Sequence, residues 1–188
     1  FIDFPDILSQ QPSILISGHI GQWELFPVLA LEHGISLVSI YQRVKHERVN
    51  QVCLELRRML GSDCLLEKDE FTRGIQGYLD QHNSLVLLSD QGRGSPRQFM
   101  GQPTCFPRSM AHLAYRSKRV VVFAASSRNG SYIDFTFSKP ISIRDNESKP
   151  AFQERLLTTY VQWLEGCVKR YPEQYFWLHD LWKKNHSA

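Results

Sequence analysis

The stretch SILISGHIGQWELF, residues 13–26, decides the expected fold, because its pattern changes from strand-like to helix-like within a few residues. Its first part, residues 13–17, is a short apolar run that is typical of a buried strand. Gly18 and Gly21 follow, and they allow a sharp turn and a close approach of the backbone to a ligand. Beyond Gly21, apolar residues recur at helical spacing until Gly34, so we expect a strand, a tight connection and a helix.

The rest of the chain repeats this alternation. Further strands are predicted for residues 36–41, 64–66, 84–89, 120–125 and 132–137, and further helices for residues 47–60, 71–81, 109–116 and 151–170. The Gly-rich and Pro-rich stretch before residue 109 is expected to be a loop. An Asn-Gly turn joins the last two strands, so this pair is expected to be antiparallel. The pattern therefore predicts an α/β fold with a mixed, largely parallel sheet flanked by helices.

Length and composition favour one compact domain over residues 1–188, because 42% of the residues are hydrophobic and can form a core. The chain begins with Phe1, so we expect it to be a piece of a longer protein. No run reaches the roughly 18 to 20 apolar residues of a membrane span, and no signal peptide is recognisable. The four cysteines lack the spacing of a zinc or redox site and are expected to be free thiols; no metal site is predicted.

Positive charge is concentrated in one part of the chain. Between Asp90 and Asp134 there is no acidic residue, while this stretch holds Arg93, Arg97, Arg108, Arg116, Lys118, Arg119 and Arg128. Such a surface suits a phosphate-bearing partner, anionic lipid headgroups, an acidic carrier protein or nucleic acid. A solvated basic face without a specific partner explains the charge equally well.

His19 and Glu24 are the first candidate catalytic residues. His19 follows the predicted strand at its carboxyl end, where open α/β sheets place their ligands. With Glu24 on the first turns of the helix, its carboxylate can reach back, accept a hydrogen bond from one imidazole nitrogen and fix the tautomer, which leaves His19 as a general base. The alternative is a structural turn histidine beside an ordinary first-turn acid. No Gly-x-Ser-x-Gly elbow of a serine hydrolase occurs.

At this point the chain resembles a known family. GHIGQWEL at residues 18–25 is similar to the His-x4-Glu signature of the bacterial lipid A late acyltransferases, the lauroyl and myristoyl transferases, and of the related phosphatidylinositol mannoside acyltransferases. Other blocks of that family are resembled, in order, by Tyr41-Gln42-Arg43, Arg57 to Gly61, Ser89-Asp90-Gln91, Phe99 to Ala114 and the ending YPEQYFWLHDLWKK at residues 171–184. Glu47 departs from the pattern, since the family usually has asparagine there.

The resemblance implies a fold of the glycerol-3-phosphate acyltransferase type and an enzyme of lipopolysaccharide biosynthesis. Such an enzyme moves a fatty acyl chain from acyl carrier protein, or from acyl-CoA, to a hydroxyl of a membrane glycolipid such as a lipid A precursor. His19 would act as base and Glu24 would orient it, with no acyl-enzyme, no cofactor and no nucleic acid involved. Backbone N–H groups after Gly21 would face the oxyanion. The implied location is the cytoplasmic face of the bacterial inner membrane, with an anchoring segment upstream.

The resemblance also points to substrate-binding residues. Arg43 is a candidate for a phosphate or headgroup contact, and Asp90 and Gln91 for pairing with Arg43 or for sugar hydroxyls. Arg128 is a candidate for a phosphate of the acceptor or of the donor's pantetheine arm. The alternative for Arg43 is a plain surface arginine. Asp90 and Gln91 could be turn residues, and Arg128 could be an exposed arginine of a strand.

The end of the chain is rich in aromatic residues: Trp163, Tyr171, Tyr175, Phe176, Trp177 and Trp182. With Lys183 and Lys184 they would suit a membrane interface, and core packing is the other explanation. Two rival functions remain at this stage. One is a non-catalytic membrane-binding or carrier-binding module that keeps the fold, and the other is a nucleic-acid-binding domain, which draws only on the basic stretch.

Overall fold

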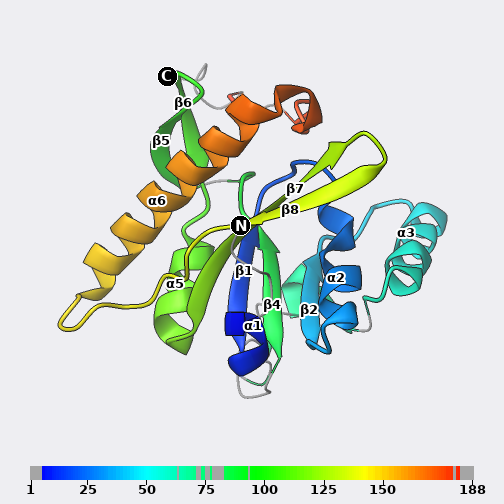
Figure 1. Ribbon diagram of the computed structural model, residues 1–188, viewed down its shortest axis with the longest axis horizontal. Helices are drawn as coiled ribbons and strands as arrows, with labels where there is room; N and C mark the ends of the chain where they lie inside the picture. Colours follow the sequence, from blue (N-terminus) through cyan, green and yellow to red (C-terminus); the bar gives the residue numbers. More distant parts are fainter. Residues whose placement is uncertain are drawn as a thin grey trace. The chain divides into compact units, whose positions relative to one another are not determined.

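The computed structural model describes residues 6–62, 64–70, 73, 74, 77, 83–92, 94–179, 181 and 182. Its strands are β1 (Ser13–Ser17), β2 (Leu37–Tyr41), β3 (Cys64–Glu67), β4 (Ser84–Leu88), β5 (Ser95–Phe99), β6 (Gln102–Phe106), β7 (Val120–Asn129) and β8 (Tyr132–Phe137). Its helices are α1 (Asp6–Gln10), α2 (Phe26–Glu32), α3 (Glu47–Met59), α5 (Ser109–Ser117) and α6 (Lys149–Arg170), with 3-10 turns η1 (Trp23–Leu25) and η2 (Pro172–Gln174) (Figure 1).

Within these described residues, the strands form a six-stranded sheet in the order β3-β2-β4-β1-β7-β8 and a separate β5-β6 hairpin. β2 is parallel to both β3 and β4, whereas β7 and β8 are antiparallel. The predicted α/β fold with a mixed, mostly parallel sheet flanked by helices is therefore confirmed. The turn between β7 and β8 lies where the Asn-Gly pair predicted it, with Gly130 at a φ of 60°.

Three expectations need correction or lie outside the described residues. The stretch before residue 109 is not a plain loop, because it contains the β5-β6 hairpin, whose prolines, Pro96 and Pro103, obscured the strand pattern. The helix expected directly after Gly21 begins later, at Phe26, with η1 in between and Pro27 in its first turn. The helix predicted for residues 71–81 falls mainly outside the described residues.

The chain divides into two compact units, and the boundary falls inside the motif, between Trp23 and Glu24. We call them the His19 unit, which comprises the described residues of Ile16–Trp23 and Leu88–Ala188, and the Glu24 unit, which comprises those of Asp3–Leu15 and Glu24–Leu87. β1 contributes its first three residues to the Glu24 unit and its last two to the His19 unit. All five of its residues are buried, as expected of a strand inside a sheet.

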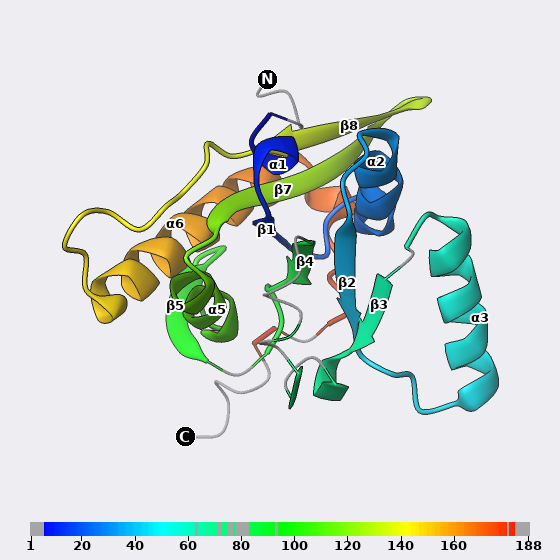
Figure 2. The same ribbon diagram turned by 90° about the horizontal axis from the view of Figure 1, so that it is seen from below.

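The Glu24 unit is built on parallel strands. In Figure 2, β2 and β3 lie side by side, and their register pairs Val38 with Cys64 and Tyr41 with Glu67. α2 packs against β2 and ends at His33, followed by Gly34 at a φ of 68°. Leu37, Val38, Leu66 and Leu85 are buried between these elements. Because β2 and β4 are parallel, the chain between them has to cross over, and α3 lies within this crossover.

The His19 unit is organised around α6, which packs against α5, β5 and β7 (Figure 1). Ser148 caps the start of α6 by accepting a hydrogen bond from the N–H of Ala151, and a proline lies in the first turn. The buried side of α6 carries apolar residues at helical spacing, among them Phe152, Leu156, Leu164 and Val168. This helix therefore supplies part of the core of the unit that carries the candidate site.

The segment before α6 is fixed by an ion pair between Glu147 and Arg155. Arg155 donates to both carboxylate oxygens of Glu147, each at 2.7 Å, and also to the carbonyl of Ser142 at 2.8 Å. The hydrogen bond from Arg155 lowers the pKa of Glu147 from 4.5 to about 2.

We therefore predict that Glu147 stabilises the fold at neutral pH and loses this contribution as the pH falls from about 4.5 towards 2. Thermal unfolding of the wild type and of Glu147→Gln should differ most above pH 5, and the difference should shrink with acidification. Glu173→Gln, which alters an exposed acid of η2, is the control and should show no such pH dependence. A constant difference between wild type and Glu147→Gln down to pH 2 would contradict the assignment.

Candidate active site

Asp90 is the centre of the candidate site and belongs to the His19 unit. Its side chain is fully buried, yet it accepts three hydrogen bonds. Oδ1 accepts from the ring Nδ1 of His19 at 2.7 Å, and Oδ2 accepts from the backbone N–H of His19 at 2.8 Å and from the hydroxyl of Tyr175 at 3.0 Å. A buried carboxylate needs such partners, because an unpaired charge in the interior is very costly.

This arrangement fixes the state of the histidine. A carboxylate only accepts hydrogen bonds, so Nδ1 of His19 carries the proton and Nε2 is left with a free lone pair. Within the described part of the chain, Nε2 has no hydrogen-bond partner, and the side chain of His19 is 22% exposed. Nε2 can therefore take a proton from a group that arrives from solvent, while Asp90 stabilises the imidazolium that forms.

The ring of His19 lies against two aromatic side chains. Trp23 meets it edge to face with ring centres 5.1 Å apart, and the ring of Phe176 lies at 6.1 Å. Trp23 and Phe176 also contact each other, at 6.2 Å. Large apolar rings lower the local dielectric constant, which strengthens the interaction between His19 and its carboxylate.

The C-terminal segment holds the histidine loop by backbone hydrogen bonds. The N–H of Phe176 donates to the carbonyl of His19 at 2.9 Å, and the N–H of Gly21 donates to the carbonyl of Gln174 at 2.9 Å. Ile20 and Tyr175 form an isolated antiparallel bridge. The aromatic ending was expected to serve core packing or a membrane interface, and in the structure Tyr175 and Phe176 belong to the candidate site.

Two phenols of the network stay protonated. Burial and the neighbouring Asp90 raise the pKa of Tyr175 far above its usual value, and burial raises that of Tyr160 as well. Tyr160 on α6 donates its hydroxyl to the carbonyl of Ser17 at 2.7 Å. Both groups therefore act as hydrogen-bond donors that fix the end of β1 and the carboxylate, not as acids that take part in proton transfer.

Glu24 has a different partner from the one that the spacing suggested. We expected its carboxylate on the imidazole, but Asp90 occupies that position. Glu24, in the Glu24 unit, accepts a forked pair of hydrogen bonds from Arg57 of α3, at 3.0 Å from Nε and 2.6 Å from Nη2. The hydrogen bond to Glu24 raises the pKa of Arg57, whose guanidinium also lies over the ring of Tyr41 at 5.9 Å. Arg57 belongs to the resembled Arg-x-x-x-Gly block but had been given no role.

The expected substrate-binding residues have diverse surroundings. Asp90 is fully buried and accepts hydrogen bonds from His19 and Tyr175, and its expected contacts with Arg43 or with sugar hydroxyls stay predictions. Arg43 is exposed and bonds to Glu47 at 2.5 Å, the residue that departs from the family pattern. Gln91 is half-buried next to Asp90. Its role and that of Arg43 stay predictions.

Arg128 lies next to the histidine loop within the His19 unit. Its backbone N–H donates to the side chain of Gln174 at 2.6 Å, and its Nε donates to the carbonyl of Gly130. An open depression is lined by Arg128 together with Gly21, Gln22, Gly130, Glu173 and Gln174. This position is compatible with the predicted contact to a phosphate, which stays a prediction.

Part of the basic stretch serves the fold. Arg97 is paired with Glu154 of α6 at 2.5 Å, and Arg108 donates to Ser95. Arg93, Lys183 and Lys184 lie outside the described residues. The ion pair with Glu154 offsets the charge of Arg97, whereas Arg108 is exposed and keeps its positive charge.

The backbone donors of the histidine loop are used within the protein. The N–H groups of His19, Ile20, Gly21 and Gln22 donate to Asp90, Gly18, Gln174 and Ser126, respectively. Of the backbone N–H groups that were expected to face the oxyanion after Gly21, that of Gln22 is therefore already used, and the role of those that follow stays a prediction. Among the residues that the structure describes, no group of three His, Cys, Asp or Glu side chains is placed to hold a metal ion.

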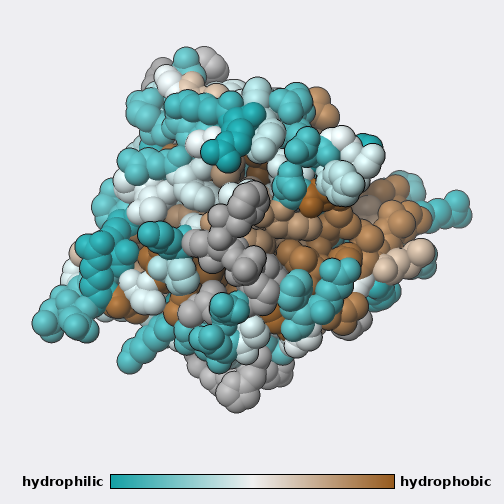
Figure 3. Space-filling model, viewed as in Figure 1, coloured by the Kyte–Doolittle hydropathy of each residue, from teal (hydrophilic) through white to brown (hydrophobic). Residues whose placement is uncertain are grey.

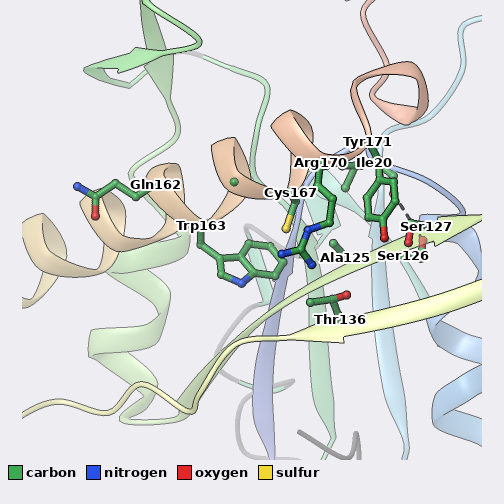
Figure 4. A pocket seen from close by; sticks show the side chains of 11 residues that line it. Ile20, Ala125, Ser126, Ser127, Thr136, Gln162, Trp163, Cys167, Arg170 and Tyr171 are labelled. Carbon is green, nitrogen blue, oxygen red and sulfur yellow. Dashed lines mark hydrogen bonds between the residues drawn. The ribbon is translucent and has the colours of Figure 1, made fainter. Parts of the chain in front are cut away.

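A cavity of about 270 Å³ lies behind the histidine loop, between the β7-β8 ribbon and the C-terminal half of α6. Figure 4 shows Trp163, Cys167 and Arg170 on α6 facing residues of β7 and β8, with Ile20 from the loop at one end. Burial raises the pKa of the Cys167 thiol to about 11, so this thiol is protonated at neutral pH and is a poor nucleophile. The four cysteines are free, as predicted.

A sequence model of one protein family, described as bacterial lipid A biosynthesis acyltransferase, matches residues 7–184. The match covers almost the whole chain and includes every resembled block. No curated protein matches the chain significantly. In the described part of the structure, no helix combines the length and the hydrophobicity needed to cross a membrane.

The backbone of the histidine loop generates a prediction about Gly21. This residue has a φ of 64°, and a Cβ atom there would lie 1.9 Å from the carbonyl oxygen of Ser126. Gly21→Ala should therefore destabilise the protein by about 3 kcal/mol or more, measured by chemical denaturation. Gly130→Ala is the matched control, because Gly130 has a φ of 60° but no neighbour within 4 Å, and its cost should be only about 1 kcal/mol. Equal losses in the two variants would contradict the close approach.

Proposed function

Because the chain belongs to the bacterial lipid A biosynthesis acyltransferase family, we propose that it transfers a fatty acyl group from acyl carrier protein, or alternatively from acyl-CoA, to a hydroxyl of a membrane glycolipid such as a lipid A precursor. The observation that carries this proposal is the pairing of Nδ1 of His19 with buried Asp90, which leaves Nε2 as a base. Lipopolysaccharide biosynthesis at the cytoplasmic face of the inner membrane is the setting that we propose for the reaction.

The proposed reaction moves one proton in two transfers, from the acceptor hydroxyl to His19 and from His19 to the donor thiolate, and it forms one oxyanion. Nε2 of His19 accepts the proton of the acceptor hydroxyl as its oxygen attacks the thioester carbonyl. The tetrahedral intermediate collapses, the C–S bond breaks, and the imidazolium returns the proton to the thiolate of the donor. Asp90 stays ionised and supports the imidazolium throughout. A thioester is already activated, so no acyl-enzyme is needed, in agreement with the protonated thiol of Cys167.

Glu24 acts in this proposal through its pair with Arg57. Both side chains are partly exposed, at 41% and 27%, so the pair remains reachable for a substrate. Arg57 presents a planar cation that suits a phosphate or carboxylate group, and Glu24 sets its orientation. Arg43, Gln91 and Arg128 remain the proposed contacts to the headgroup, the acceptor sugar and a phosphate of acceptor or donor, respectively.

The cavity behind the histidine loop is the proposed place for the apolar part of the donor. Its walls include the ring of Trp163, the buried Ile20 and Ala125, and the protonated thiol of Cys167. Burying methylene groups against such walls is favourable by about 0.8 kcal/mol per group. Arg170 lines the same cavity and offers a cation to a polar or anionic end of the ligand.

A non-catalytic module that keeps the fold is the second candidate. The buried network of Asp90, His19 and Tyr175 argues against it, because a carboxylate at 0% exposure with three matched donors is costly to maintain for binding alone. The basic stretch gives little support to nucleic acid binding, because no recognised nucleic-acid-binding motif accompanies it.

The first test is acyl transfer from radiolabelled acyl carrier protein, and separately from acyl-CoA, to glycolipid acceptors in detergent. His19→Ala should lower kcat by about 10³-fold, because the general base is lost. Asp90→Asn should lower it by about 10²-fold or more, because an amide favours the wrong tautomer and cannot stabilise the imidazolium. His112→Ala, which removes an exposed histidine of α5, is the control and should retain full activity.

Circular dichroism and thermal unfolding must show that the variants are folded. Wild-type activity in folded His19→Ala would exclude His19 as the base. No transfer from either donor by the wild type, to any acceptor of the panel, would favour the non-catalytic module.

A second test addresses the pair of Glu24 and Arg57. Glu24→Gln and Arg57→Gln should each lower kcat/KM about tenfold, and the double variant should lose no more than either single variant, because the pair acts as one unit. Arg58→Gln, an exposed neighbour on α3, is the matched control. Multiplicative losses in the double variant would show that Glu24 acts independently of Arg57.

A further inference from the structure

The outer side of α3 is an exposed apolar row that no described element covers. Val49, Val52, Leu56 and Met59 follow one another at intervals of three or four residues, so they lie along one stripe of the helix. Their exposed fractions are 49%, 54%, 53% and 82%. Scattered exposed apolar residues are ordinary, but four in register on one helix mark an interaction surface.

Neighbouring residues extend this row at both ends within the Glu24 unit. Val44 precedes α3 and is 39% exposed, and Leu31 of α2 is 56% exposed. Leu31 lies close to Gly61, directly after α3, because a Cβ on Gly61 would be 3.1 Å from a methyl group of Leu31. Figure 3 shows hydrophobic side chains gathered over α2 and α3. We call the row from Val44 to Met59, together with Leu31, the α3 stripe.

The other side of α3 is anchored to its own unit, which makes the stripe a stable feature. Asn50 is buried and accepts a hydrogen bond from the backbone N–H of Val44 at 3.1 Å. Arg57 reaches inward to Glu24 and over the ring of Tyr41. The stripe is therefore the outward side of a helix whose inward side already makes its hydrogen bonds within the Glu24 unit.

Charges around the α3 stripe are mainly positive. Residues 43–58 carry five cations, Arg43, Lys45, Arg48, Arg57 and Arg58, against two acids, Glu47 and Glu55. Arg43 and Arg57 are paired with Glu47 and Glu24, whereas Lys45, Arg48 and Arg58 are exposed; Arg48 lies next to the stripe on the helix, and Arg58 lies farther round it. A helix with an apolar stripe and flanking cations matches the boundary between acyl chains and anionic headgroups of a bilayer.

We propose that the α3 stripe is the surface by which this protein docks onto an anionic lipid bilayer. The inference rests on the proposed function, because the acceptor of that reaction resides in a membrane. The stripe consists of Val, Leu and Met side chains and has none of the aromatic anchors that dominate protein interfaces. A second copy of this chain would bring its own cations against those of the first, which disfavours self-association through the same surface.

The helix that carries the docking surface also holds a candidate site residue, Glu24, and both belong to the Glu24 unit. The helix whose outer side enters the lipid interface carries on its inner side Arg57, the partner of Glu24. A lipid headgroup that meets the flank of α3 therefore meets the helix that holds the motif glutamate. This gives α3 two roles, to seat the protein on the bilayer and to orient Glu24.

The test is co-sedimentation of the protein with phosphatidylcholine vesicles that contain or lack phosphatidylglycerol. The wild type should bind the anionic vesicles, and binding should weaken as salt rises. Val52→Gln/Leu56→Gln should lower the partition coefficient at least about tenfold. Tyr132→Gln/Ile133→Gln is the matched control, because it removes two exposed apolar side chains, 77% and 38% exposed, from the β7-β8 ribbon and should bind like the wild type.

Several outcomes would overturn the proposal. These are a wild type that does not bind, a Val52→Gln/Leu56→Gln variant that binds normally, and a control that loses as much as this variant. The Val52→Gln/Leu56→Gln variant could also lose self-association, or binding of acyl carrier protein, while it still binds vesicles. That result would assign the stripe to another partner.

Acyl transfer to an acceptor dispersed in detergent micelles separates this inference from the proposed function. Normal transfer in micelles without vesicle binding would overturn the docking surface alone. Vesicle binding through the stripe without any transfer in micelles would overturn the proposed function and keep the surface. If the docking surface and the proposed function are both correct, Val52→Gln/Leu56→Gln should retain acyl transfer in micelles and lose acyl transfer to an acceptor embedded in vesicles.

Discussion

The burial of one carboxylate, that of Asp90, is the constraint on which the candidate site depends. A charge at 0% exposure is tolerated only when donors surround it, and here three donors come from two residues: the backbone N–H and the ring of His19, and the phenol of Tyr175. The same contacts that satisfy the charge fix the tautomer of the histidine. Stability and catalytic competence therefore rest on the same set of hydrogen bonds.

The surroundings of this carboxylate explain why the local backbone is so restricted. Gly18 leaves no room for a side chain, since a Cβ would lie 2.9 Å from Leu164 and 3.2 Å from Asp90, and Gly21 approaches the carbonyl of Ser126 even more closely. The C-terminal segment closes the loop from the other side through Gln174 and Phe176. A charge that must be shielded and a histidine that must remain accessible leave few alternative conformations for the loop.

Glu24, the glutamate of the His-x4-Glu motif, is held by a partner of its own. Glu24 belongs to the unit that contains α3, and its forked pair with Arg57 gives it a defined orientation without using the histidine. An acyltransferase of this family has to meet both an acyl donor and a lipid acceptor. We propose that the His19 unit carries out proton transfer and that α3, which also presents the apolar stripe, recognises the acceptor.

Local sequence patterns determined most of the elements of this protein, although not the β5-β6 hairpin. The apolar run at residues 13–17, the helical spacing in residues 47–60 and the Asn-Gly pair each predicted a segment that the structure contains, because such periodicity depends on near neighbours. They also placed His19 and Asp90 at the carboxyl ends of strands. Only the tertiary structure decided that these strands are adjacent, so that Asp90, and not Glu24, meets the imidazole. Strand order and the return of Tyr175 to the site depend on packing between distant segments, which no local pattern encodes.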